Sequence, residues 1–378
     1  MFQLSQKYGP AMLLKLGTLP TVVVSNAEMA REVLQTHDAD FCSRPVHSPG
    51  PEKLSYGFLG ITFGPHSHYN SRVRKLFTYE LLKGREQFLW AARVDEMSKM
   101  VKSLADVATT PVNLNDHIFK TAEGILGQAA FGKSYGAKQF KDKKLQTVLD
   151  ECMDIASSFN AEDFYPNWAG RLIDYLTGYR ARLERNFNDL DVGKNRESSK
   201  LSMNNVKALL LVGNGAELLM HPEKLKEAKA DVRSVVGKKA LVEEPDMEHL
   251  KYIKCIVKEI FRLHPPAPLF IAHESINSTK IGKEVYDVLA KTRILVNAWA
   301  VGRDPAHWSD PHKFCPERSC PGMMMGSTSV TYILANLLHC CDWEFPEGVR
   351  REDVCMEEEG GITMHKKTPL IVVPKRVN

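Results

Sequence analysis

Hydrophobic residues near position 260 recur at the spacing of an α-helix. Between Lys251 and His264, apolar side chains stand three and four positions apart, which places them on one helix face; they are Tyr252, Ile253, Ile256, Val257, Ile260 and Phe261. Pro265 and Pro266 follow, and proline has no backbone N–H with which to continue the helix. The pattern predicts a helix over residues 251–264 with one buried face.

Near the amino end, the pattern changes to short runs typical of strands. Residues 12–24 predict two short strands, and the three valines at 22–24 are the buried part of the second. Either Ser25 or Asn26 then provides the cap of a helix predicted over residues 27–36. We therefore expect a small sheet followed by a helix.

The rest of the chain is predicted to be mostly helical. Proline and glycine residues indicate a long loop over residues 45–65, and the pattern after it predicts a helix over residues 69–83. Helices dominate from there to about residue 261, whereas residues 362–365 and 370–373 predict two short strands. The expected fold class is mainly α with small β-sheets.

Composition and charge are those of a globular protein, and we predict a single domain over residues 1–378. Lysine and arginine number 50 against 46 aspartates and glutamates, so the net charge of +4 provides no field for nucleic acid, and no such partner is expected. The eight cysteines are scattered, which favours a reducing compartment. Nowhere do about 18 apolar residues follow one another, so we predict no membrane span in this chain.

A series of short motifs surrounds and follows the helix predicted near residue 260. Glu259 and Arg262 share one face of that helix, which alone is a weak signal. The segments that follow, in order, are Pro265-Pro-Ala-Pro, His273-Glu-Ser, Asn297-Ala-Trp-Ala-Val-Gly-Arg-Asp-Pro, Pro316-Glu-Arg and Cys320-Pro-Gly. Upstream stand Tyr8-Gly-Pro, Phe41-Cys-Ser-Arg-Pro and Arg74-Lys-Leu-Phe. This ordered series resembles the plant-type cytochrome P450 family over essentially the whole length.

The resemblance implies a cytochrome P450 fold that holds haem b. It implies a haem-thiolate monooxygenase, which inserts one oxygen atom of O₂ into a small hydrophobic secondary metabolite. Electrons would come from NADPH through NADPH-cytochrome P450 reductase. The family's usual place is the cytosolic face of the endoplasmic reticulum membrane, although without an anchor the chain could be cytoplasmic.

The resemblance also implies roles for single residues. The thiolate of Cys320 would be the proximal ligand of the haem iron, the only metal expected. Glu259, Arg262 and Arg318 match the family's structural salt-bridge triad beside the haem-binding loop. Arg74 and His273 match positions whose side chains meet the haem propionates, where a cation stabilises a carboxylate. No residue is assigned to the chemical step itself.

The sequence departs from the family pattern in ways that predict an incomplete fold. Only Ser319 separates Arg318 from Cys320, where the family has about twenty residues, and two extended peptide steps span only about 7 Å. The central helix lacks the oxygen-binding segment around residues 208–215, and the helix connection near residues 191–200 is short. We also expect the family's amino-terminal membrane anchor to be missing. These losses shorten the haem-binding loop, the central helix and one connection.

Two hypotheses about function therefore stay open. The first is the active monooxygenase that the family implies. The second is a catalytically inactive remnant, either a helical interaction module or the product of a gene model with missing exons, which does not bind haem normally. A point change at Asn70, where the family has tryptophan four positions before the propionate arginine, removes an aromatic ring and its N–H donor.

Overall fold

The computed structural model describes residues 1–79, 86–131, 145–158, 160–192, 215–283, 285–317, 327–360 and 364–377. Its helices are α1 (Phe2–Tyr8), α2 (Ala27–Arg31), the π-helix η1 (Glu32–Thr36), α3 (Asp38–Phe41), α4 (Pro49–Leu54), α5 (His68–Phe77), α6 (Glu86–Asp106), α7 (Leu114–Phe131), α8 (Leu145–Ser157), α9 (Ala161–Phe164), α10 (Trp168–Leu176), α11 (Tyr179–Val192), α13 (Pro222–Val236), α14 (Asp246–His249), α15 (Lys251–Leu263), α16 (Ala298–Val301), α17 (Ser327–Cys340) and the 3-10 helix η5 (Arg351–Asp353). Residues 215–220 are helical too. The strands are β1 (Ala11–Leu16), β2 (Leu19–Val24), β3 (Val112–Asn113), β4 (His273–Glu274), β5 (Thr279–Ile281), β6 (Tyr286–Val288), β7 (Arg293–Val296), β8 (Cys341–Glu344), β9 (Glu358–Gly360), β10 (Met364–Lys366) and β11 (Ile371–Arg376).

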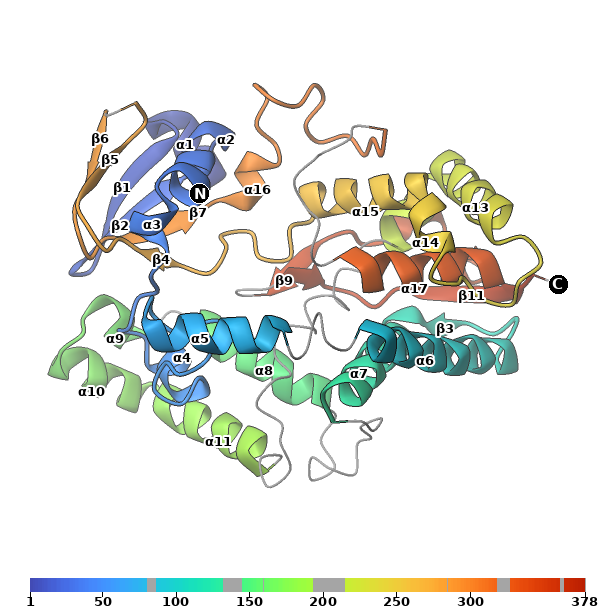
Figure 1. Ribbon diagram of the computed structural model, residues 1–378, viewed down its shortest axis with the longest axis horizontal. Helices are drawn as coiled ribbons and strands as arrows, with labels where there is room; N and C mark the ends of the chain where they lie inside the picture. Colours follow the sequence, from blue (N-terminus) through green and yellow to red (C-terminus); the bar gives the residue numbers. More distant parts are fainter. Residues whose placement is uncertain are drawn as a thin grey trace.

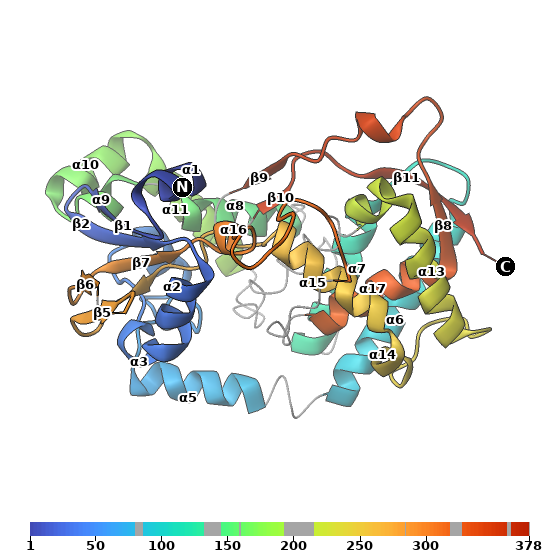
Figure 2. The ribbon, with the colours of Figure 1, turned by 90° about the horizontal axis from the view of Figure 1, so that it is seen from above.

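The elements form a β-rich end and a helical end. Strands β1, β2 and β5–β7 lie together with α1–α3 at one end of the molecule in both views (Figures 1 and 2). Helices α6, α13, α15 and α17 lie at the other end. This arrangement confirms the predicted class, mainly α with small sheets, whereas the single domain over residues 1–378 stays a prediction. No helix of the described segments combines the length and the apolar character needed to cross a membrane.

The β-rich end contains the sheet predicted from the amino-terminal pattern. β1 pairs antiparallel with β2, β7 runs parallel to β2, and β4 closes the order β1-β2-β7-β4. Val22 and Val24 are buried with Ile294 and Val296 against α2. Asn26 is the cap of α2, because its side chain accepts a hydrogen bond from the backbone N–H of Met29. The predicted helix over residues 27–36 is therefore confirmed, with a π-helical second half.

Helix α15 lies in the main hydrophobic core, as its spacing predicted. Ile253, Ile256, Val257 and Ile260 are fully buried and belong to one cluster with residues of α13 and α17. Burying an aliphatic side chain of this size contributes about 1.5–3 kcal/mol. Because this face is fixed in the core, the polar residues of α15 are held in defined positions as well.

Two stretches differ from the predictions. The predicted loop over residues 45–65 contains α4, since Pro49 and Pro51 lie in its first turn, where no backbone N–H needs a partner inside the helix. Strands β3 to β9 were not predicted, and the strand predicted over residues 362–365 lies partly outside the described residues. Strand β8 pairs with β11 near the carboxyl end, and β7 pairs with the distant β2, whereas β9 pairs with β10, the next strand along the chain.

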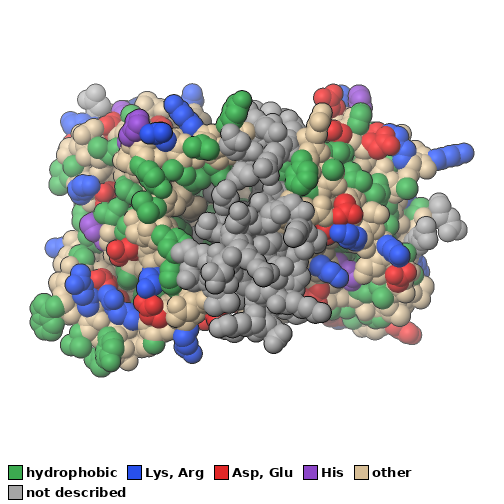
Figure 3. Space-filling view, turned by 60° about the horizontal axis from the view of Figure 1, so that its bottom comes forward, with side chains coloured by type: hydrophobic (Ala, Val, Ile, Leu, Met, Phe, Trp, Pro, Cys, Tyr) green, Lys and Arg blue, Asp and Glu red, His purple; other side chains and the backbone are tan. Residues whose placement is uncertain are grey.

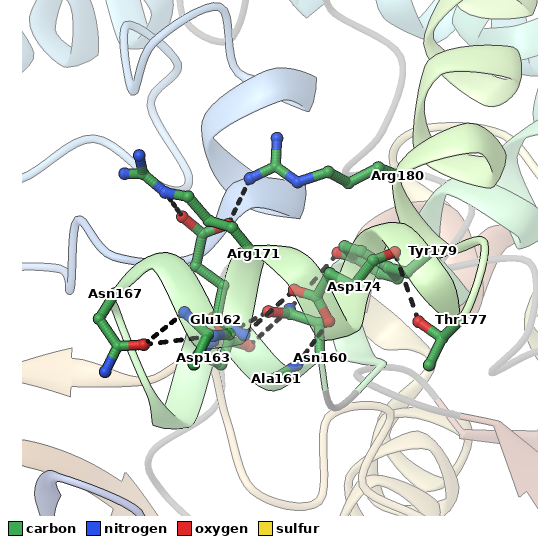
Figure 4. Close-up of polar contacts among 12 residues, drawn as sticks. Asn160, Ala161, Glu162, Asp163, Asn167, Arg171, Asp174, Thr177, Tyr179 and Arg180 are labelled. Carbon is green, nitrogen blue, oxygen red and sulfur yellow. Dashed lines mark hydrogen bonds and ion pairs between the residues drawn. The ribbon is translucent and has the colours of Figure 1, made fainter.

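Helices α9, α10 and α11 are joined by a polar network (Figure 4). The carboxylate of Asp174 accepts hydrogen bonds from the backbone N–H groups of Ala161 (2.7 Å) and Glu162 (3.1 Å), at the start of α9. Glu162 in turn pairs with Arg171 and Arg180. Since each partner stands on a different helical segment, the network fixes these segments relative to one another.

Candidate functional site

Two oppositely charged side chains on α15 form a buried pair. Arg262 donates from Nε to Glu259 Oε2 and from Nη2 to Glu259 Oε1, both at 2.8 Å. Their side chains are only 3% and 1% exposed, so neither charge is solvated by bulk water. The i, i+3 spacing read from the sequence thus produces a two-point ion pair, the geometry that suits a guanidinium and a carboxylate.

The pair also holds the chain that follows α16. Arg262 Nη1 donates to the carbonyls of Gly302 (2.7 Å) and Pro311 (2.6 Å), and Nη2 donates to that of Lys313 (3.1 Å). Glu259 Oε1 accepts the backbone N–H of Cys315 at 2.9 Å. These contacts organise the irregular backbone of residues 302–315, which leads toward the expected iron ligand.

Arg44, which follows α3, lies within electrostatic reach of two other cation-capable side chains, Arg74 on α5 and His273 in β4. Burial, and then the positive charge of Arg74, lower the pKa of Arg44 to about 10. Burial, and then the charge of Arg44, lower the pKa of His273. Within the described part of the chain, neither arginine has a carboxylate at ion-pair distance, so the three groups form a site of positive potential.

Backbone carbonyl groups bind all three side chains, and Arg74 Nη2 donates to that of Ile61 at 3.4 Å. Arg44 Nη1 donates to the carbonyls of Ile271 (2.7 Å) and Ala272 (3.0 Å). His273 Nδ1 lies 2.8 Å from the carbonyl oxygen of Phe41, which can only accept, so Nδ1 carries a proton. The other ring nitrogen, Nε2, is the one left to meet a ligand. Segments 41–44 and 271–274 thus hold each other, and the two side chains with them.

The structure therefore unites the predicted residues in two groups. Glu259 lies with Arg262, and Arg74 and His273 each lie near Arg44. Arg318 and Cys320 fall outside the described residues, so their places stay predictions. Arg44 was not assigned from the sequence, although it lies within the Phe41-Cys-Ser-Arg-Pro motif; only its approach to the other two cations reveals it.

Asn70 has a local structural role. It stands one turn before Arg74 on α5 and is buried, with Nδ2 3.4 Å from the carbonyl oxygen of Gly60. Its backbone N–H is held by the side chain of Ser67, the cap of α5. The amide of Asn70 thus binds the preceding loop.

The sequence matches the family Cytochrome P450 over residues 1–208 and 216–318. This is most of the chain, and it includes both groups of residues described above. The chain belongs to the cytochrome P450 family.

Relatives and solved structures agree with this assignment. The chain is 42% identical to 4-hydroxyphenylacetaldehyde oxime monooxygenase of Sorghum bicolor, over 99% of this chain and 84% of that protein. It is 39% identical to 2-methylbutanal oxime monooxygenase of Manihot esculenta, over 99% of this chain and 86% of that protein. A zebrafish cytochrome P450, solved with progesterone, superimposes with a TM-score of 0.78 at 21% identity, covering 99% of this chain and 98% of that chain. The chain is thus a P450-family oxidoreductase by descent, with monooxygenases among its relatives.

The chain is shorter than its alignment with the sorghum enzyme. The alignment with the sorghum enzyme runs over 447 residues, whereas this chain has 378, so at least 69 alignment positions (447 minus 378) have no residue of this chain. The family match is interrupted between residues 208 and 216 and stops at residue 318. The interruption falls at the predicted break in the central helix, and the match stops directly before the predicted short loop.

The described residues fit the acidic edge of a P450 haem. Haem carries two propionate carboxylates, which need positive partners. The two arginines and the histidine supply that charge, and among the described residues no carboxylate pairs with either arginine. Arg44, Arg74 and His273 would hold these propionates through charge-assisted hydrogen bonds. The family also implies a thiolate-bound iron in the haem.

Proposed function

We propose that the chain binds haem b and acts as a haem-thiolate monooxygenase, inserting one oxygen atom of O₂ into a small hydrophobic metabolite. The cluster of Arg44, Arg74 and His273 carries the proposal, because Arg44 repels both of the other cation-capable groups, and an anionic ligand there would stabilise all three. NADPH would supply electrons through NADPH-cytochrome P450 reductase. The bound haem supplies the oxygen chemistry itself.

The remaining site residues have separate roles in this proposal. Cys320 would give the thiolate ligand of the iron. Arg318 would join Glu259 and Arg262 as a scaffold. The observed bonds from Arg262 to the backbone of residues 302–313 support that scaffold role, because they fix the segment that precedes the ligand.

For the substrate, we propose an aldehyde oxime with a small hydrophobic group. Both named relatives are oxime monooxygenases, at 42% and 39% identity, although one oxime is aromatic and the other is aliphatic. Binding is measured by titrating the haem-loaded chain with each oxime and following the haem spectrum. The parent aldehydes, which lack the N–OH group, are the matched controls. Equal spectral responses to aldehyde and oxime would contradict this substrate class.

We further propose that the chain works at the cytosolic face of the endoplasmic reticulum membrane. Support comes from α10, whose side chains Trp168 (78% exposed), Tyr175 (73%) and Leu176 (73%) are apolar and open to solvent. Hydrophobic side chains are visible at the lower left of Figure 3, where α10 lies. Apolar surface of this kind marks a contact site. Sedimentation with lipid vesicles tests the proposal, and Trp168→Ser should reduce the bound fraction.

The decisive experiment is the carbon monoxide spectrum of the reduced chain, expressed with haem supplied. A thiolate-type Soret band is expected, and Cys320→Ala should abolish it. Arg44→Met and Arg74→Met should each weaken haem binding about 10- to 100-fold, the worth of a charge-assisted hydrogen bond of about 1.5–3 kcal/mol. Arg72→Met, an exposed change on the same helix, is the control and should leave haem affinity unchanged.

The alternative is a folded remnant that takes no haem. It is favoured by the alignment positions that this chain leaves empty and by the single residue between Arg318 and Cys320. A chain that unfolds cooperatively but shows no Soret band after haem titration would establish it. Because folding and haem binding are measured separately, a misfolded sample is not mistaken for a remnant.

A further inference from the structure

His264 lies between two carboxylates, away from the residues assigned to haem. Its Nδ1 is 2.5 Å from Glu358 Oε1, and its Nε2 is 2.7 Å from Glu217 Oε1. The three side chains are only 20%, 24% and 12% exposed, in that order. Both ring nitrogens thus face an oxygen that accepts hydrogen bonds, an arrangement that only the doubly protonated, positively charged ring satisfies fully.

A second cation completes the cluster. Arg303 is buried, donates from Nη2 to the carbonyl of Leu263 at 2.6 Å and stacks on the ring of Trp299, with 3.9 Å from its Cζ to the ring centroid. Glu358 and Glu217 both favour its charged form. With His264 protonated, two positive charges balance two negative ones. Such balance is what a buried charged group requires.

Two more charged groups face the cluster. His221 is 3.4 Å from the other carboxylate oxygen of Glu217, and its side chain is 41% exposed. Arg262 acts on Arg303 and lowers its pKa, second to burial. Burial disfavours the charged His264, but the hydrogen bonds to Glu217 and Glu358 outweigh burial and raise its pKa from 6.5 to about 9.

The cluster joins three segments that are distant in sequence. Glu217 stands on the helical residues 215–220, His264 directly follows α15, and Glu358 begins β9. β9 pairs antiparallel with β10. The backbone N–H of Met364 in β10 donates to the carbonyl of Pro266 at 2.9 Å. The hairpin β9–β10 is therefore attached to the end of α15 at two points, of which one depends on the charge of His264.

We propose that protonated His264 is a clamp that holds the hairpin β9–β10 and the helical residues 215–220 to the end of α15, and that loss of its proton releases the hairpin. Deprotonation removes one hydrogen bond and leaves two partly buried carboxylates facing the remaining cation, Arg303. The inference does not rest on haem binding. It adds a pH-sensitive conformational device to the proposed function.

The direction in which pH changes the stabilisation by the clamp follows from the raised pKa of His264. Stabilisation by the clamp is complete below about pH 6.5 and is lost as the pH rises from there through about 9. A pKa difference of this size corresponds to a factor on the order of a hundred in the equilibrium between closed and open hairpin. Below pH 6.5 the clamp should contribute no pH dependence.

Hydrogen exchange of the full chain, followed by mass spectrometry from pH 6 to 10, tests the clamp. After correction for intrinsic exchange rates, the protection of residues 364–366 should fall by a factor on the order of a hundred across that range. His264→Gln should show low protection without this transition. His307→Gln, at an exposed histidine that pairs with Asp304 outside the cluster, is the control and should keep the wild-type transition. A His264→Gln chain with the wild-type pH profile would overturn the proposal.

A second variant covers the case in which His264→Gln does not fold. Glu358→Gln keeps an oxygen acceptor but removes one negative charge, so the transition should move to lower pH. An unchanged midpoint in this variant would count against the clamp. Nuclear magnetic resonance titration of the His264 ring gives an independent check, since a pKa at or below 6.5 in the wild-type chain would also overturn it.

Discussion

Replacing Arg262 with lysine should destabilise the fold strongly without changing the net charge. The guanidinium makes two hydrogen bonds to Glu259 and three to the carbonyls of Gly302, Pro311 and Lys313. An ammonium has three donors on one atom, so at least two of these five bonds are lost. Glu259 is buried and the three carbonyl partners belong to partly buried hydrogen bonds, so each group left unsatisfied costs about 1–3 kcal/mol.

We therefore expect a loss of about 3–5 kcal/mol in the free energy of unfolding, the range for breaking a buried pair. Because whole domains are stable by only about 5–15 kcal/mol, the effect is large. Urea unfolding followed by far-ultraviolet circular dichroism measures it as a lower midpoint. Glu259→Gln should cost a similar amount, since it removes the charge that faces the guanidinium.

Arg350 provides a matched control for this prediction. It pairs with Asp353 through the same two guanidinium atoms, Nε at 3.1 Å and Nη2 at 3.0 Å, but its side chain is 73% exposed. Arg350→Lys should change stability by no more than about 0.5 kcal/mol, since solvent screens an exposed pair. If both lysine variants unfold at the same urea concentration, burial does not increase the contribution of the Arg262–Glu259 pair to the free energy of unfolding.

Further predictions concern the backbone and a buried thiol. Gly17 has φ +64°, and a Cβ there would lie 2.3 Å from the carbonyl oxygen of Phe164, so Gly17→Ala should cost about 1–3 kcal/mol more than Gly57→Ala, whose φ is +74° but which has open space around it. Equal unfolding free energies for the two variants would refute the clash. Burial raises the pKa of the Cys152 thiol to about 12, so at pH 8 it should react with iodoacetamide about a thousandfold more slowly in the folded chain than in urea. Peptide mapping after timed labelling measures this ratio, and equal rates would contradict the burial of Cys152.

The sequence by itself determined those features that depend on neighbouring residues. Apolar spacing predicted α15 to within one residue of its end, because residues three and four apart must share a helix face. Short apolar runs on either side of a turn predicted the two strands β1 and β2, which pair with each other. The order of the motifs predicted the family, and the predicted break in the central helix coincides with the interruption of the family match between residues 208 and 216.

Tertiary structure alone decided which distant residues meet. Arg44 lies 227 positions from Ile271, whose carbonyl holds it, and His264 lies 94 positions from Glu358. No local pattern encodes such contacts, since loop closure and core packing bring the segments together only when the chain folds. For the same reason α4 was missed in a stretch rich in proline and glycine. The sequence thus determined the family and the scaffold pair, whereas folding decided where charge accumulates, because electrostatic interactions depend on distance in space.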